Sequence, residues 1–292
     1  MLLAHSESLQ SPWQWQPHPE VWAIMALVLA GYFLALKIVG PRFVSPGDPS
    51  ATRREKSLFV GGVLVLWISA DWPMHDLSEE FLFSAHMLQH FLFSLVAPPL
   101  LILGTPGWLA RWILRPKVVM SAARRLSRPI TALLLFNGYL VFSHWPGFVD
   151  FVLGSQAAHF FAHLVLVGLA LLMWAPVFSP IHEIPRISAP AQMLYLFGQT
   201  IVPTVPASFL TFAEKPFYKA YSEAPRISAG LDAVTDQRIA GVFMKLGGGL
   251  LLWAVIAVLF FRWSAREEQG TPDAAEWQDL ERQINQARAI NR

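Results

Sequence analysis

Seven apolar runs dominate the chain and constrain its fold more than any other feature. They cover residues 20–40, 57–73, 82–104, 129–146, 156–178, 190–212 and 239–263. Most of them reach the ~20 residues that a helix needs to cross ~30 Å of hydrocarbon. Only 14% of the residues are charged, against about 25% in soluble domains. Because extended segments cannot satisfy their backbone in lipid, we predict an all-α membrane protein, a bundle of seven transmembrane helices.

Lysine and arginine are distributed unevenly between the two ends of these helices. They gather in the loops after the first, third and fifth runs and in the C-terminal tail. They are absent from residues 1–19 and from the loops after the second and fourth runs. Since cytoplasmic loops carry the excess of basic residues in membrane proteins, we predict that the N-terminus lies outside and the C-terminus in the cytoplasm.

The chain is predicted to form one transmembrane domain, residues 1–264, and a cytoplasmic tail, residues 265–292. In the tail, Thr271 and Pro272 suit the N-cap and the first position of a helix. Apolar residues then recur at helical spacing. A short amphipathic helix lying on the membrane is therefore expected, and a solvated, frayed tail is the alternative.

Two motifs each place a pair of histidines four residues apart, HMLQH at residues 86–90 and HFFAH at residues 159–163. On a helix, positions i and i+4 share one face, so each pair can offer two nitrogens to one ion. Ionisable groups are costly inside a membrane and are functional candidates there. The chain has no cysteine, which excludes disulfides, thiolate metal sites and iron–sulfur clusters.

The predicted topology brings six of the nine histidines to one layer, the outer leaflet of the membrane and its surface. These six are His75, His86, His90, His144, His159 and His163. They come from at least four segments, as a metal or haem site in a helical bundle requires. We therefore predict that they bind a metal, and imidazole rings that merely reach the interface are the simpler alternative.

Other residues of this layer extend the predicted metal site. Met74 and Met87 are thioether candidates for further ligands. Asp71 and Asp236 are candidate carboxylates that bind a liganding histidine and fix its tautomer, and Met244 is placed near them. Imidazole together with thioether favours copper, and zinc and haem are the alternatives.

Several short motifs then point to a known family. They are SAHMLQH at residues 84–90, APPLL at 97–101, GTP at 104–106, HFFAH at 159–163, MWAP at 173–176 and DQRIAGVFM at 236–244. Together they resemble the polytopic CtaG-like family of cytochrome c oxidase assembly factors. The chain departs from the last motif at Lys245, where that family often has tryptophan. The resemblance implies a multi-pass protein of the bacterial plasma membrane that helps supply copper to a haem–copper oxidase.

From the histidine layer and this resemblance we expect an oxidase assembly factor, not an enzyme, that binds copper near the outer membrane face and helps deliver it. The expected partners are oxidase subunits, a periplasmic copper donor and membrane lipid, and no nucleic acid. His75, His144 and the methionines are expected to form the path by which copper arrives or leaves.

Three other functions remain open at this point. A haem-binding electron-transfer protein would use two facing histidines. A copper transporter would need ligands in both leaflets, and the inner parts of the third and fifth runs offer almost none. A membrane di-iron oxygenase of the histidine-box type would, by resemblance, place its histidines on the cytoplasmic face.

Overall fold

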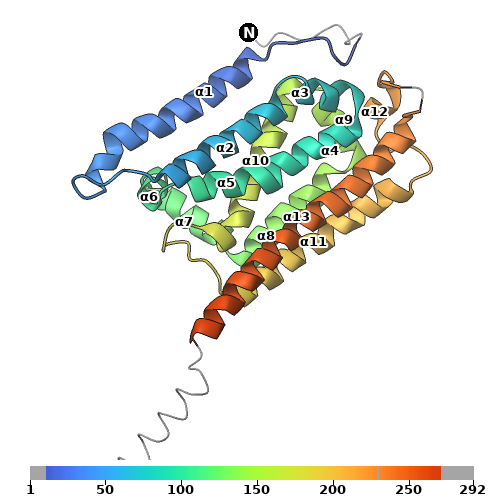
Figure 1. Cartoon of the computed structure of the whole chain (residues 1–292). Helices are drawn as coiled ribbons and strands as arrows, with labels where there is room; N and C mark the ends of the chain where they lie inside the picture. Colours follow the sequence, from blue (N-terminus) through green and yellow to red (C-terminus); the bar gives the residue numbers. More distant parts are fainter. Residues whose placement is uncertain (1–10, 229, 271–292) are drawn as a thin grey trace, which may run out of the picture.

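The computed structural model describes residues 11–228 and 230–270, and within them all regular structure is helical (Figure 1). The α-helices are α1 (Pro19–Leu34), α2 (Arg53–Ala70), α3 (Met74–Asp76), α4 (Phe83–Phe91), α5 (Ala97–Gly104), α6 (Gly107–Ile113), α7 (Lys117–Leu126), α8 (Pro129–Ser143), α9 (Pro146–Leu153), α10 (Gln156–Phe178), α11 (Ala189–Phe212), α12 (Lys219–Glu223) and α13 (Ala233–Gly270). Short π-helical and 3-10 turns continue some of them, namely η1 (Ala35–Val39), η2 (Gly40–Arg42), η3 (Leu77–Phe81) and η4 (Leu92–Val96).

Five helical stretches are long and apolar enough to cross a membrane. They are Pro19–Arg42, Phe83–Gly104, Gln156–Phe178, Ala189–Phe212 and Ala233–Glu268. Two bent pairs, α2 with α3–η3 and α8 with α9, raise the number to seven if each pair is one span. Large apolar side chains such as Leu27, Ile130 and Leu194 are more than two-thirds exposed, as lipid-facing residues would be. The predicted all-α membrane bundle is therefore confirmed, while the direction of its termini stays a prediction.

Both bent spans change direction beside a proline. Pro73 stands between α2 and α3, and Pro146 is the first residue of α9. Proline has no backbone N–H and cannot continue the hydrogen bonds of a helix. The axes bend by 51° in the first pair and by 77° in the second. The second part of each pair thus lies at an end of the bundle instead of completing a straight helix.

Successive spans alternate in direction, so one end of the bundle collects α3, α9 and α12 with the first turns of α4 and α13 (Figure 1). Hydrogen bonds tie this end together. The carboxylate of Asp236 in α13 accepts the backbone N–H of Phe83 at 2.7 Å. The hydroxyl of Tyr218, just before α12, donates to the carbonyl of His144 at 3.1 Å. This end, which we call the histidine end, contains the candidate site.

The core lies between α8, α10, α11 and the middle of the α4–η4–α5 span. Trp174 and Leu196 are completely buried in it, and the Trp174 indole donates to the Ser94 carbonyl at 3.0 Å. Gly241 lies where α13 approaches α11, because a Cβ atom there would come within 2.8 Å of the Ala207 carbonyl oxygen. Close packing of this kind is typical of membrane helices with small interface residues.

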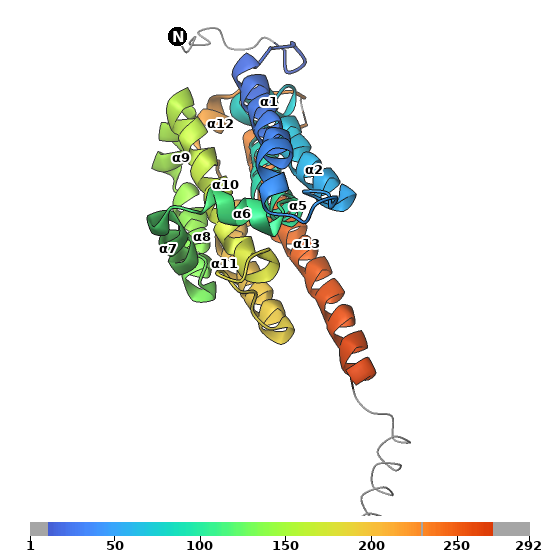
Figure 2. The same ribbon diagram turned by 90° about the vertical axis from the view of Figure 1, so that its left-hand side faces the viewer.

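Helix α1 lies at the edge of the bundle, beside α2 (Figures 1 and 2). Tyr32 stacks on Phe59 of α2, with ring centroids 3.8 Å apart, and donates to the Gly104 carbonyl at 2.9 Å. Near the start of α1, the Trp22 indole donates to Asp71 at 2.7 Å. Hydrogen bonds and ring stacking thus attach both ends of α1 to the rest of the bundle.

Helix α13 is longer than the apolar run that predicted it, since it continues to Gly270 (Figure 2). The amphipathic helix expected after Thr271 lies outside the described residues.

Candidate metal centre

Helices α4 and α10 bring the two predicted histidine pairs together at the histidine end. Within each pair the ring centroids are 4.2 Å apart, as expected for neighbours on one helical face. Across the helices, the centroids of His86 and His159 are 5.7 Å apart, and the Nε2 atoms of His90 and His163 are 3.2 Å apart. The four imidazoles therefore face one another across the two helices.

Three of these rings form a group with the geometry of a metal site. His86, His159 and His163 each offer a nitrogen, and the three nitrogens lie within 4.8 Å of one another. Nitrogens bound to one ion at ~2.0–2.1 Å are somewhat closer together, so small ring rotations would bring these to bonding distance. We call this group the histidine trio.

The trio contains buried nitrogens that have no hydrogen-bond partner among the described residues. They are Nδ1 of His86 and Nε2 of His159, whose side chains are only 5% and 3% exposed. An unpaired polar atom in a buried site costs free energy, which an ion would recover by binding to it. The donor set therefore fits a metal ion that prefers imidazole.

A carboxylate that the sequence motifs did not indicate orients the trio. Glu79, in the π-helical turn η3, contacts Nδ1 of His159 through Oε1 and lies 3.2 Å from Nε2 of His75 through the same oxygen. When Nδ1–H of His159 donates to Glu79, its lone pair is left on Nε2, the atom without a partner. The signal that could have found Glu79 is an acidic residue seven positions before His86, the first histidine of the HMLQH motif.

His75 joins the centre from α3, beside the trio. Its ring stacks on that of His159, with centroids 6.1 Å apart and an interplanar angle of 16°. Its other neighbour is His18, which approaches edge-on with centroids 4.8 Å apart. Met74, the residue before His75 and a predicted thioether ligand, is half-buried at the start of α3.

His144 and Met87 form a separate contact on the other side of His90. Nε2 of His144 lies 3.4 Å from the sulfur of Met87, and its Nδ1 donates to the Leu140 carbonyl at 2.6 Å. His144 ends α8, whereas Met87 lies on α4 between the two histidines of the first motif. The structure thus pairs a predicted imidazole ligand with a predicted thioether ligand.

The three residues predicted to support the ligands lie close to the centre but act on other groups. Asp71 accepts hydrogen bonds from the indoles of Trp22 and Trp67. Asp236 accepts the backbone N–H groups of Phe83 and Ser84, so it caps the helix that carries His86. Met244 packs against the apolar cluster that contains Met87. Among the described residues, Glu79 and not these aspartates is the carboxylate that contacts the trio.

A segment around α12 covers the centre at the histidine end. The Tyr221 hydroxyl donates to the Ser78 carbonyl at 2.6 Å, and its ring lies 6.1 Å from that of His86. Burial, together with the carboxylates of Glu79 and Asp236, raises the pKa of Tyr221 well above its usual value. The phenol therefore stays protonated and continues to donate, which holds the segment over the imidazoles.

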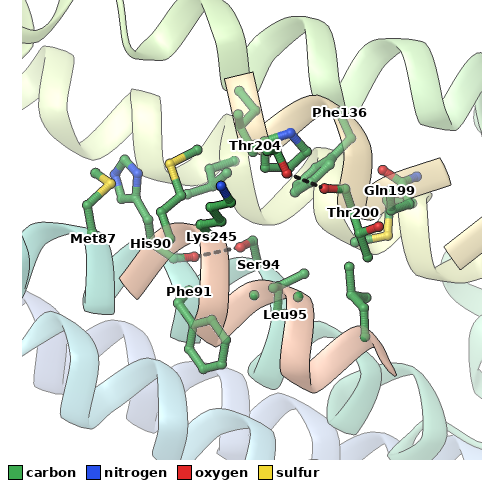
Figure 3. Close-up of a pocket in the computed structure, with 18 of the residues that line it drawn as sticks. Met87, His90, Phe91, Ser94, Leu95, Phe136, Gln199, Thr200, Thr204 and Lys245 are labelled. Carbon is green, nitrogen blue, oxygen red and sulfur yellow. Dashed lines mark hydrogen bonds between the residues drawn. The ribbon is translucent and has the colours of Figure 1, made fainter. Parts of the chain in front are cut away.

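A largely apolar pocket inside the bundle begins beside His90 (Figure 3). Its polar and sulfur-containing lining residues come from five spans and are Met87, His90, Ser94, Ser143, His144, Met173, Gln199, Thr200, Thr204, Met244 and Lys245. Ser94 donates to the carbonyl of His90, and Thr204 donates to that of Thr200 (Figure 3). The pocket therefore connects the centre, through His90, with the His144–Met87 contact and with the middle of the membrane-spanning helices.

The family model described as cytochrome c oxidase caa3 assembly factor (Caa3_CtaG) matches residues 23–266. No curated protein and no solved structure matches the chain.

Proposed function

Because the chain belongs to the cytochrome c oxidase caa3 assembly factor family, we propose that it serves oxidase assembly by binding copper at the histidine trio and passing it on. The observation that carries this proposal is the pair of buried, unpartnered nitrogens on His86 and His159, two of the three imidazoles that the trio brings together. An assembly factor for a copper-containing oxidase needs a site that can hold the ion and also release it.

The donor chemistry favours copper over its competitors. Imidazole suits both copper and zinc, but thioether sulfur selects Cu(I). Met87 supplies such a sulfur next to Nε2 of His144, one helical position after His86. A haem bound between facing histidines is less well supported, because His90 and His163 lie 3.2 Å apart and leave no space for an iron and its porphyrin.

We propose that copper is the cargo of this site and moves by ligand exchange. Glu79 holds Nδ1 of His159, which presents Nε2 to the ion. His90 adjoins His163 and is the next imidazole available to accept it. From His90 the pocket leads to Met87 and His144. Each exchange replaces one neutral ligand by another and leaves the oxidation state of copper unchanged.

The charge distribution of the loops supports an orientation with the histidine end on the outer side of the membrane, and membership of the caa3 assembly factor family supports the bacterial plasma membrane as its location. In that orientation a periplasmic donor can reach the trio after the α12 segment moves aside. The oxidase subunits would receive copper at the same face or through the pocket within the bilayer.

Metal analysis of the full chain, purified in mild detergent, tests the proposal. We expect the wild-type protein to bind copper and the His86→Ala/His159→Ala double variant to bind one copper ion fewer per chain. His182→Ala is the matched control, because His182 is exposed in the loop between α10 and α11, away from the cluster. Equal copper content in the double variant and the control would overturn the proposal, and a Soret band would replace it with the haem alternative.

A further inference from the structure

A second group of metal-ligating side chains lies at the histidine end, outside the trio. His18, His75 and Asp76 each offer a ligand atom, and these atoms lie within 4.8 Å of one another. His18 directly precedes α1, whereas His75 and Asp76 belong to α3. The group therefore joins the edge helix of the bundle to the short helix that follows the second span. We call it the outer triad.

The buried polar atoms of the outer triad are only partly satisfied. Nε2 of His18 lies 3.0 Å from Oδ1 of Asp76, and the two side chains are 6% and 7% exposed. The second carboxylate oxygen of Asp76 is buried and has no partner among the described residues. Nδ1 of His75 is buried without a partner as well, since Nε2 of the same ring faces Glu79.

A purely structural ion pair between His18 and Asp76 would account for only half of these atoms. It satisfies Oδ1 but leaves Oδ2 of Asp76 and Nδ1 of His75 buried and unpaired. Such atoms are rare in folded proteins and call for a partner. One ion bound to the carboxylate and to both imidazoles satisfies all three residues at once.

We propose that His18, His75 and Asp76 form a second metal site, which binds a divalent transition-metal ion. Two imidazoles and one carboxylate are a harder donor set than three imidazoles, and they suit Cu²⁺ or Zn²⁺ better than Cu⁺. The site takes its ligands from both sides of the contact between α1 and α3, so the bound ion also fixes α1 against the bundle.

Glu79 connects the outer triad to the trio. Its Oε1 contacts His75 of the triad at 3.2 Å and also contacts His159 of the trio. The two sites therefore lie side by side and share a carboxylate that orients one imidazole in each. Binding at the outer triad does not require the trio to hold copper, so this inference stands apart from the proposed function.

Titration with Cu²⁺ alone, on the full chain in detergent, tests the second site. We expect two ions per chain in the wild type and one in Asp76→Asn. We also expect one ion in His86→Ala/His163→Ala, with an electron paramagnetic resonance spectrum that shows two coupled nitrogens. Asp48→Asn is the matched control, because Asp48 is exposed in the loop between α1 and α2. Equal Cu²⁺ binding in Asp76→Asn and Asp48→Asn would overturn the inference.

A second variant keeps the test independent of folding. His18 directly precedes the first membrane-length helix, Pro19–Arg42, so His18→Gln replaces a buried ligand without changing any residue of the membrane-length helices. It is expected to lose the same ion as Asp76→Asn while eluting at the wild-type position in size-exclusion chromatography. A folded His18→Gln protein that still binds two ions would refute the site. Loss of an ion from His18→Gln, with no loss from the trio variant, would instead support the outer triad and reject the proposed copper trio.

Discussion

Replacing Glu79 by glutamine should weaken copper binding although Glu79 is not itself a proposed ligand. Its Oε1 contacts imidazole nitrogens of both His75 and His159. Glutamine keeps one acceptor oxygen but loses the negative charge, so it holds the N–H groups of the two rings less strongly. Residues that orient metal-binding histidines typically account for 10–100-fold in affinity. This range corresponds to about 1.4–2.8 kcal/mol, at about 1.4 kcal/mol for each factor of ten.

The affinity is measured by competition with a chromogenic copper chelator on detergent-purified protein. Glu223→Gln is the matched control, because Glu223 is 68% exposed and lies in α12 at the same end of the bundle. Glu79→Asp keeps the negative charge, so its copper affinity should lie between that of Glu79→Gln and that of the wild type. If Glu79→Gln binds copper as tightly as Glu223→Gln, the argument that this carboxylate sets the tautomer of His159 is wrong.

Three further predictions concern the scaffold that holds the site. In Gly104→Ala, the new Cβ would lie 2.3 Å from the backbone nitrogen of Phe59, so α5 and α2 must separate and stability should fall by about 1–3 kcal/mol. Thermal unfolding checks this, and the control Gly168→Ala, whose Cβ meets nothing within 4 Å inside α10, should not lower the midpoint. Asp236→Ala removes the cap of α4 and should lower the stability by about 0.5–2 kcal/mol, with weaker copper binding in the chelator assay. If the stability falls by this amount and the copper affinity does not change, the cap does not position the trio. Tyr32→Phe deletes the hydrogen bond to the Gly104 carbonyl and should cost about 0.5–1.5 kcal/mol, seen as faster proteolysis near α1; unchanged cleavage would mean that the bond does not hold this helix.

The predicted residues of the site differ in how far sequence alone could place them. The two histidines of each HxxxH motif share a helical face because helix geometry is local, and the structure places their rings 4.2 Å apart. By contrast, the contact between Met87 and His144 joins residues 57 positions apart. It depends on how α4 and α8 rotate about their own axes, which no local pattern specifies.

The carboxylates around the site also depend on contacts between residues far apart in the chain. Asp71 and Asp236 were predicted to support the imidazoles because they lie in the right layer. In the structure, Asp71 accepts hydrogen bonds from two tryptophan indoles, and Asp236 accepts a backbone N–H of α4. Glu79 takes the place beside His159, since the bent turn η3 carries it back over the start of α10. A bend whose direction is set by packing against distant helices cannot be read from the residues that form it.

The sequence by itself determined that the chain is built from apolar, membrane-length helices and that the imidazoles pair along two of them. These properties follow from hydrophobicity and from the 3.6-residue period, which act over a single turn or a single span. Only the tertiary structure decided which imidazoles meet, which carboxylate touches them, and that His18 comes within 3.0 Å of Asp76. Those distances depend on the bends, rotations and close approaches of helices, and packing between residues far apart in the chain fixes all three.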